Sequence, residues 1–190
     1  MINALKIFFI LLISIAVSAQ DGKKMELTEA IRTCLTSSKM DGSISDKVSE
    51  CLNNTEFPFF MVVDLDEEVI TSHSLDQITI INYWFIECPP CKVEKGFLTK
   101  LNEEYSGLNI LSLCRNSKNE LKEEIKKAKL PEWDYVYDYE NQNVSLNTFG
   151  YPMTIILDNN RRVRKVFVGG IVDEEKYEKA KSVINDVKNG

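Results

Sequence analysis

The strongest indication of the fold is the segment Ile78-Thr79-Ile80-Ile81-Asn82-Tyr83-Trp84-Phe85-Ile86-Glu87-Cys88-Pro89-Pro90-Cys91. Its first eight residues are apolar almost throughout, which is typical of a strand that is covered on both faces of a sheet. Apolar residues then recur with helical spacing over residues 89–105, and two prolines fit the first turn of a helix because N–H groups there have no helical partner. The sequence therefore places two cysteines, separated by two residues, where a buried strand meets a helix.

Two thiols in this position form the reactive unit of dithiol–disulfide exchange. A helix N-terminus stabilises a thiolate, which is the species that attacks a disulfide. We predict that Cys88 is the exposed attacking thiol and that Cys91, one turn into the helix, is the shielded thiol that resolves the mixed disulfide. An inert structural disulfide and a zinc site are the alternatives, although a zinc site needs four ligands and the chain has one histidine, His73, and no second Cys-x-x-Cys.

The rest of the sequence alternates strand-like and helix-like segments. In the helix over residues 89–105, apolar residues recur every four positions and are expected to face the core; they are Val93, Phe97, Leu101 and Tyr105. We further predict strands at 59–65, 69–71, 108–113, 135–137, 153–157 and 163–168, a helix at 117–129, and a last helix after Gly169-Gly170. This order is typical of an α/β fold with a mixed central sheet flanked by helices.

The first nineteen residues have the features of a signal peptide. Lys6 supplies a positive charge, residues 7–17 are apolar, and Val17-Ser18-Ala19 presents small residues at a cleavage position. The apolar run is too short to span a bilayer comfortably, and polar residues follow it directly. We therefore predict an exported protein, periplasmic or secreted, with no stable membrane insertion after cleavage of residues 1–19. A retained membrane anchor is the alternative.

We predict an N-terminal helical extension over residues 20–56, before a domain over residues 57–190. Helical spacing indicates two short helices around a turn at residues 40–43. Cys34 and Cys51 lie on facing sides of this helix pair, and we expect a structural disulfide between them, which would contribute about 3 kcal/mol by loop closure. The alternative is a second redox pair that relays electrons to the Cys-x-x-Cys pair.

The composition excludes some partners. The chain carries 23 Lys and Arg against 29 Asp and Glu, and this charge of −6 argues against nucleic acid or an anionic membrane as the main partner. All five cysteines follow residue 19, and cysteines in an oxidising compartment tend to be paired or reactive. Because five is odd, at least one has no intramolecular partner. Cys114 ends a core strand, and we interpret it as a buried thiol, with a third redox residue as the alternative.

Two blocks of this sequence resemble the exported ResA/TlpA-like branch of the thioredoxin fold. The first is Ile81-Asn82-Tyr83-Trp84-Phe85-Ile86-Glu87-Cys88-Pro89-Pro90-Cys91-Lys92, which is similar to the active-site block of that branch. The second is Phe149-Gly150-Tyr151-Pro152-Met153-Thr154-Ile155-Ile156-Leu157-Asp158, which is similar to its cis-proline block. The resemblance covers roughly residues 57–188. It implies a thioredoxin-like sheet and thiol–disulfide oxidoreductase activity.

The resemblance also implies roles for individual residues. Pro152 would face the dithiol, and the backbone of Tyr151 would pair with an extended substrate segment. Glu94 lies three residues after Cys91 and coincides with a glutamate of this branch, where a buried carboxyl group relays protons to the resolving thiol. A solvated helix carboxylate is the alternative for Glu94. Asn82 stands where thioredoxin has a buried acid, so proton transfer would shift to Glu94 or water.

The leading hypothesis is a thiol–disulfide oxidoreductase that requires no organic cofactor or metal. Its partners would be cysteine-containing exported proteins and an upstream thiol electron donor. We expect a reductant, although Glu87 and Lys92 beside the dithiol act on its potential in opposite directions and leave an oxidant open. A thiol peroxidase would want threonine and arginine beside Cys88, and none flanks it. A copper chaperone or a peptide-binding holdase is the other alternative, and for copper only Met153 is well placed as a further ligand.

Overall fold

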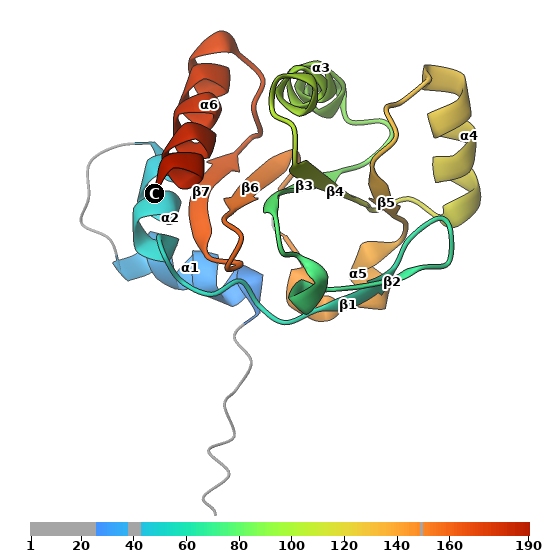
Figure 1. Cartoon of the computed structure of the whole chain (residues 1–190). Helices are drawn as coiled ribbons and strands as arrows, with labels where there is room; N and C mark the ends of the chain where they lie inside the picture. Colours follow the sequence, from blue (N-terminus) through green and yellow to red (C-terminus); the bar gives the residue numbers. More distant parts are fainter. Residues whose placement is uncertain (1–25, 38–42, 149) are drawn as a thin grey trace, which may run out of the picture.

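The structure is a computed structural model that describes residues 26–37, 43–148 and 150–190. The predicted signal peptide lies outside the described residues, as does most of the predicted turn at 40–43. In the part of the chain that is described, no helix is long and apolar enough to cross a membrane. Figure 1 shows a central sheet with helices on both faces.

The central sheet has five strands in the order β5-β4-β3-β6-β7. These strands are β3 (Ile78–Trp84), β4 (Leu108–Cys114), β5 (Asp134–Val136), β6 (Met153–Leu157) and β7 (Val163–Val168). β3, β4 and β5 run parallel to one another, whereas β6 pairs antiparallel with β3 and β7 antiparallel with β6. The thioredoxin-like mixed sheet predicted from the sequence is therefore confirmed.

Side chains of the strands alternate between two hydrophobic cores, one on each face of the sheet. The upper face in Figure 1 carries α3 (Pro89–Glu104), α4 (Lys118–Ala128) and α6 (Glu174–Asn189), and Ile80 of β3 packs there with Leu98 and Ile184. The lower face carries α1 (Leu27–Ser37), α5 (Tyr139–Gln142) and the hairpin of β1 (Met61–Val63) and β2 (Val69–Thr71), and Ile81 and Tyr83 pack there. The remaining elements of the described residues are α2 (Ile44–Leu52) and two 3₁₀ turns, Ser72–Ser74 and Val144–Leu146.

The core-facing side predicted for the helix over residues 89–105 is wrong at its first residue. The four-residue repeat predicts Val93 in the core, but its side chain is 52% exposed. A helix has 3.6 residues per turn, so a strict four-residue repeat drifts around it and leaves the core at one end. The buried face of α3 instead includes two charged residues, Glu94 and Lys95, at the end nearest the dithiol.

Two predicted segments have different extents. The first predicted strand, 59–65, forms only over β1, because the side chain of Asp64 accepts hydrogen bonds from the N–H groups of Asp66 and Glu68 and turns the chain. The strand predicted at 135–137 lies one residue earlier, and α5 follows it in a region with no clear periodicity in the sequence.

The N-terminal extension covers the outer edge of the sheet. Ser45 and Ser49 lie one turn apart on α2 (Ile44–Leu52), beside alternate residues of β7. The Ser49 hydroxyl accepts from the N–H of Val166 and donates to its carbonyl, at 2.9 Å in both cases. The Ser45 hydroxyl does the same for Val168, at 2.9 and 3.2 Å. Two hydroxyls thus satisfy the free backbone groups of an edge strand, which would otherwise be open to another strand.

A disulfide joins Cys34 of α1 to Cys51 of α2, with 5.7 Å between their Cα atoms. We expect the double substitution Cys34→Ser and Cys51→Ser to lower the free energy of unfolding by about 3 kcal/mol, because the bond closes a short loop in the unfolded chain. Urea denaturation measures this loss. The exchange rate of the Cys88–Cys91 pair should stay unchanged at a temperature where the variant is folded. A folded variant that has lost exchange would instead support the electron-relay role.

Candidate active site at the Cys88–Cys91 pair

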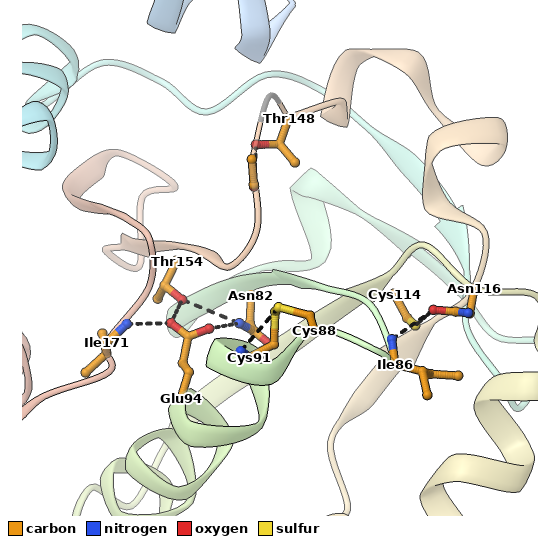
Figure 2. Close-up of a disulfide and its surroundings, with 11 residues drawn as sticks. Asn82, Ile86, Cys88, Cys91, Glu94, Cys114, Asn116, Thr148, Thr154 and Ile171 are labelled. Carbon is orange, nitrogen blue, oxygen red and sulfur yellow. Dashed lines mark hydrogen bonds between the residues drawn. A yellow bond between two sulfur atoms is a disulfide. The ribbon is translucent and has the colours of Figure 1, made fainter.

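Cys88 and Cys91 lie where β3 ends and α3 begins. They form a disulfide, with 5.3 Å between their Cα atoms (Figure 2). Cys88 is the N-cap of α3, and its sulfur accepts a hydrogen bond from the N–H of Cys91 at 3.2 Å. Pro89 and Pro90 occupy the first helical turn, so they leave fewer unpaired N–H groups there. The local sequence therefore places the Cys88 sulfur at the positive end of the helix dipole.

Both sulfurs are nearly buried in this disulfide form. Cys88 is 2% exposed and Cys91 is 1% exposed. Phe85, Ile86 and Tyr151 pack against the cluster that contains both cysteines. The prediction of an exposed Cys88 is therefore wrong for the disulfide form, because the neighbouring Phe85 and Tyr151 from a distant loop pack against the motif.

Glu94 is completely buried one turn after Cys91, so the alternative of a solvated carboxylate is wrong. One of its oxygens accepts hydrogen bonds from the Thr154 hydroxyl and the Ile171 N–H, both at 2.6 Å, and the other accepts from the side-chain amide of Asn82 at 2.8 Å (Figure 2). Burial raises the pKa of Glu94, and these hydrogen bonds and the charge of Lys95 oppose that rise. The site thus holds a buried carboxyl group beside the dithiol whose proton is retained to higher pH.

The peptide bond between Tyr151 and Pro152 is cis, as the resemblance implies, and Pro152 is buried. Pro152 and Glu94 meet at Gly170, the residue that ends the turn after β7. A Cβ atom on Gly170 would lie 2.5 Å from a Glu94 carboxyl oxygen and 2.6 Å from Cγ of Pro152. The proline loop, the buried carboxyl group and the end of the hairpin therefore pack with no spare volume between them.

The ring of Tyr151 helps to cover the dithiol. It packs edge-on against Phe85, with ring centroids 5.3 Å apart. Its hydroxyl lies 2.6 Å from the Tyr139 hydroxyl and donates to Glu140 at 2.5 Å. Arg115 forms an ion pair with the same glutamate at 3.3 Å. Burial raises the pKa of Tyr151, so this ring stays neutral.

Other candidate residues lie in less reactive settings. Cys114 is a free, fully buried thiol, and burial raises its pKa to about 12, so the interpretation as a buried thiol is confirmed. His73 packs against the ring of Phe59. Met153 is buried, and its sulfur lies 3.4 Å from the Thr148 hydroxyl. The described residues contain no group of three or more His, Cys, Asp or Glu that would hold a metal ion.

The sequence profile of the AhpC/TSA family matches residues 53–186 of the chain, which is most of its length. The chain belongs to the AhpC/TSA family. Among curated proteins it is similar to the thioredoxin-like protein YneN of Bacillus subtilis, with 26% identity over 104 residues. That match covers 53% of this chain and 61% of YneN, so the chain spans about three fifths of that relative.

Several solved structures share the fold of this AhpC/TSA family member. The thioredoxin domain of one from Bacteroides vulgatus has a TM-score of 0.60 at 18% identity, over 70% of this chain and 98% of that domain. A putative thiol:disulfide interchange protein DsbE from Chlorobium tepidum has a TM-score of 0.61 at 16% identity, over 71% and 96%. StoA from Bacillus subtilis has a TM-score of 0.53 at 19% identity, over 66% and 95%. These likenesses support the thioredoxin fold found here.

Four residues around the site of this family member are not predicted from its sequence; they are Arg115, Tyr139, Glu140 and Lys95. Arg115 was open to prediction, because β3 and β4 run parallel and Trp84 pairs with Cys114, which places the next residues of both strands side by side. Tyr139 and Glu140 come from a segment with no periodicity. Lys95 lies outside the apolar repeat that indicates the buried face of its helix.

Proposed function

We propose that this protein is an exported thiol–disulfide oxidoreductase that acts as a reductant of partner proteins through Cys88 and Cys91. The observation that carries the proposal is the disulfide at the start of α3, beside the cis-proline loop and a buried carboxyl group. A strand–helix junction with two cysteines in one turn passes two electrons without a metal or an organic cofactor.

The proposed reaction has two exchange steps. In the reduced protein, the Cys88 thiolate attacks a sulfur of the partner's disulfide, forms a mixed disulfide and releases one partner thiolate. Cys91 then loses its proton and attacks the Cys88 sulfur, which restores the Cys88–Cys91 disulfide and releases the second partner thiolate. The partner gains two electrons, and an upstream dithiol donor returns two electrons to the protein.

The surrounding residues have distinct proposed roles. Glu94 accepts the proton that Cys91 loses, directly or through water, because burial raises the pKa of this carboxyl group and makes its carboxylate a stronger base. The backbone of Tyr151 pairs with an extended segment of the partner, and Pro152 fixes the direction of that backbone. Partners are cysteine-containing exported proteins.

The reduction potential of the Cys88–Cys91 pair tests the direction of exchange. It is measured by equilibrating the protein from residue 20 onward with a glutathione or dithiothreitol redox buffer. A value near or below that of thioredoxin, about −270 mV, supports a reductant. A value nearer −120 mV would contradict it and indicate an oxidant that forms disulfides in exported proteins.

Two assays on the same protein address the alternatives. Rapid peroxide consumption by the reduced protein without protein-disulfide reduction would indicate a thiol peroxidase. Tight copper binding by the reduced protein that blocks exchange would indicate a copper chaperone. Under the proposal, protein-disulfide reduction is fast and both other activities are weak.

Glu94→Gln tests the proton role. Asn82 has a side-chain oxygen with no hydrogen-bond partner among the described residues, so a flip of its amide would let it accept from the side-chain amide that the substitution introduces. We expect the variant to fold and the pH dependence of Cys91 reactivity, measured by alkylation, to change. An unchanged profile would contradict the relay role.

Stability gives a second readout for Glu94→Gln. The pKa of Glu94 is higher in the folded protein than in the unfolded chain, so the folded state binds the proton more tightly. Wild-type stability should therefore fall as pH rises above 4.5, the ordinary pKa of a glutamate, and Glu94→Gln should flatten this dependence in urea denaturation.

A further inference from the structure

Lys95 is an unusual residue beside the dithiol because its charged end is buried. The side chain is 7% exposed. Its Nζ atom has no hydrogen-bond partner among the residues that the structure describes. Lysine is almost never buried without a partner, since an isolated ammonium loses its hydration. The position therefore favours a neutral amine until another negative charge comes near.

Aromatic rings surround this amine. Nζ lies 3.4 Å from the ring centroid of Trp84, 5.4 Å from that of Trp133 and 5.7 Å from that of Tyr135. The faces of such rings carry partial negative charge, so they accept an ammonium at low cost when it forms. Trp84 and Tyr135 pack in the same cluster as Cys88 and Cys91. A charge on Lys95 would thus lie in the same low-dielectric region as the two sulfurs.

Two adjacent ionisable residues of α3, one acidic and one basic, lie on two sides of the dithiol. Glu94 is directed toward Asn82, Thr154 and Ile171, and Figure 2 shows this group on one side of the disulfide with Cys114 on the other side. Lys95 lies one turn after Cys91 and interacts electrostatically with Cys114. Glu94 is therefore close to the proline loop, and Lys95 is on the Trp84 side.

No other titratable group binds Nζ of Lys95 among the described residues, because the buried carboxyl group of Glu94 is bound by Asn82, Thr154 and Ile171 instead. Cys114 of β4 is neutral, since burial raises its pKa to about 12, and burial also raises the pKa of Tyr135 of β5. The remaining charged groups line a groove of about 650 Å³ beside Lys95 or interact with its charge; they are Glu87, Lys92, Glu94, Glu124 and Lys127. Burial lowers the pKa of Lys95 to about 7 while the disulfide is intact.

We infer that Lys95 takes up one of the two protons that accompany reduction of the Cys88–Cys91 disulfide, so that its ammonium balances the charge of the Cys88 thiolate. The donor dithiol loses two electrons and two protons and becomes a disulfide. The Cys88–Cys91 bond breaks, Cys91 takes one proton and becomes a thiol, and Cys88 remains a thiolate. The second proton goes to the Lys95 amine. This inference rests on the proposed function, since it concerns the same disulfide, and it makes Lys95 a positioning residue.

Lys95→Met and Lys95→Arg separate this role from packing. In the reduced protein, the ultraviolet absorbance of the thiolate gives the pKa of Cys88. Lys95→Met should raise this pKa by about one unit, which lowers the thiolate fraction near neutral pH severalfold. Lys95→Arg should leave it near the wild-type value, because a guanidinium keeps its charge. Lys92→Met is the matched control: its charge lies on the same helix but is exposed, so the change should be small.

The number of protons that the protein takes up on reduction is a readout that a change in side-chain packing alone would not alter. The equilibrium constant for reduction is measured against pH with a small-molecule dithiol, above the pKa of Cys88 in each variant, above the pKa of about 7 of Lys95 in the disulfide form, and below the pKa of the dithiol. In the wild type it should be independent of pH, because the protein takes up both protons that the dithiol releases, and in Lys95→Met and Lys95→Arg it should rise about tenfold per pH unit, because one proton is released. The guanidinium of Lys95→Arg restores the charge but not the second proton.

A count of one proton in the wild type would overturn the inference, even if neither variant folded. A Lys95→Met variant with the wild-type count and Cys88 pKa would also overturn it. The chemical reductant makes the result independent of partner proteins. A two-proton count in a protein that fails to reduce any protein disulfide would therefore contradict the proposed function and support this inference.

Discussion

We expect Cys88→Ser to abolish dithiol–disulfide exchange, with a loss of at least about a thousandfold in rate. A serine hydroxyl at this helix start does not ionise near neutral pH and does not form a mixed disulfide. The remaining thiols do not replace it. Cys91 lies inside the first turn of α3 and lacks the N-cap position of Cys88, and Cys114 is fully buried with a pKa raised to about 12. The measurement is the rate of reduction of a protein disulfide by the reduced variant.

Two further variants make this result specific. Cys91→Ser should keep the first attack and accumulate a mixed disulfide with the partner, which non-reducing electrophoresis detects. Cys114→Ala should exchange at the wild-type rate, because burial raises the pKa of this thiol to about 12. Wild-type activity in Cys88→Ser would exclude the proposed mechanism. Loss of activity in a folded Cys114→Ala would assign a redox role to the third thiol.

Gly170→Ala should cause the largest loss of stability of any small substitution near the site. The added Cβ would lie 2.5 Å from a Glu94 oxygen and 2.6 Å from Cγ of Pro152, and both groups are buried. Gly170 also has a φ of +69°, which a residue with a Cβ adopts at a cost. Backbone strain and overpacking together should lower the free energy of unfolding by about 2–5 kcal/mol in urea denaturation.

Gly169→Ala is the matched control. Gly169 has a similar φ of +81°, but a Cβ there meets no described atom within 4 Å. The control therefore carries the backbone strain without the overlap and should lose only about 1–2 kcal/mol. Equal losses in the two variants would show that the contact between Gly170, Glu94 and Pro152 does not limit the packing of the site.

Features that depend on neighbouring residues follow from the amino-acid sequence alone. The apolar run of β3, the prolines after Cys88 and the spacing of the two cysteines set the strand, the helix start and the disulfide, because each depends on contacts within about one helical turn. The resemblance added the cis-proline and a place for Glu94. The disulfide between Cys34 and Cys51 was predicted correctly because the two short helices that carry them are close in the chain.

The burial and the charge of residues around the dithiol, and the protection of the edge strand, depend instead on contacts between distant segments. Ser45 and Ser49 reach β7 across more than a hundred residues, and no periodicity marks serines that pair with an edge strand. The burial of Cys88 depends on Tyr151 from a distant loop. Lys95 is a polar residue in the sequence, and its burial follows from the ring of Trp84 at the end of β3 and the rings of Trp133 and Tyr135 at β5. Charge, burial and proton affinity at the dithiol are sums over such distant neighbours, so the local sequence does not specify them.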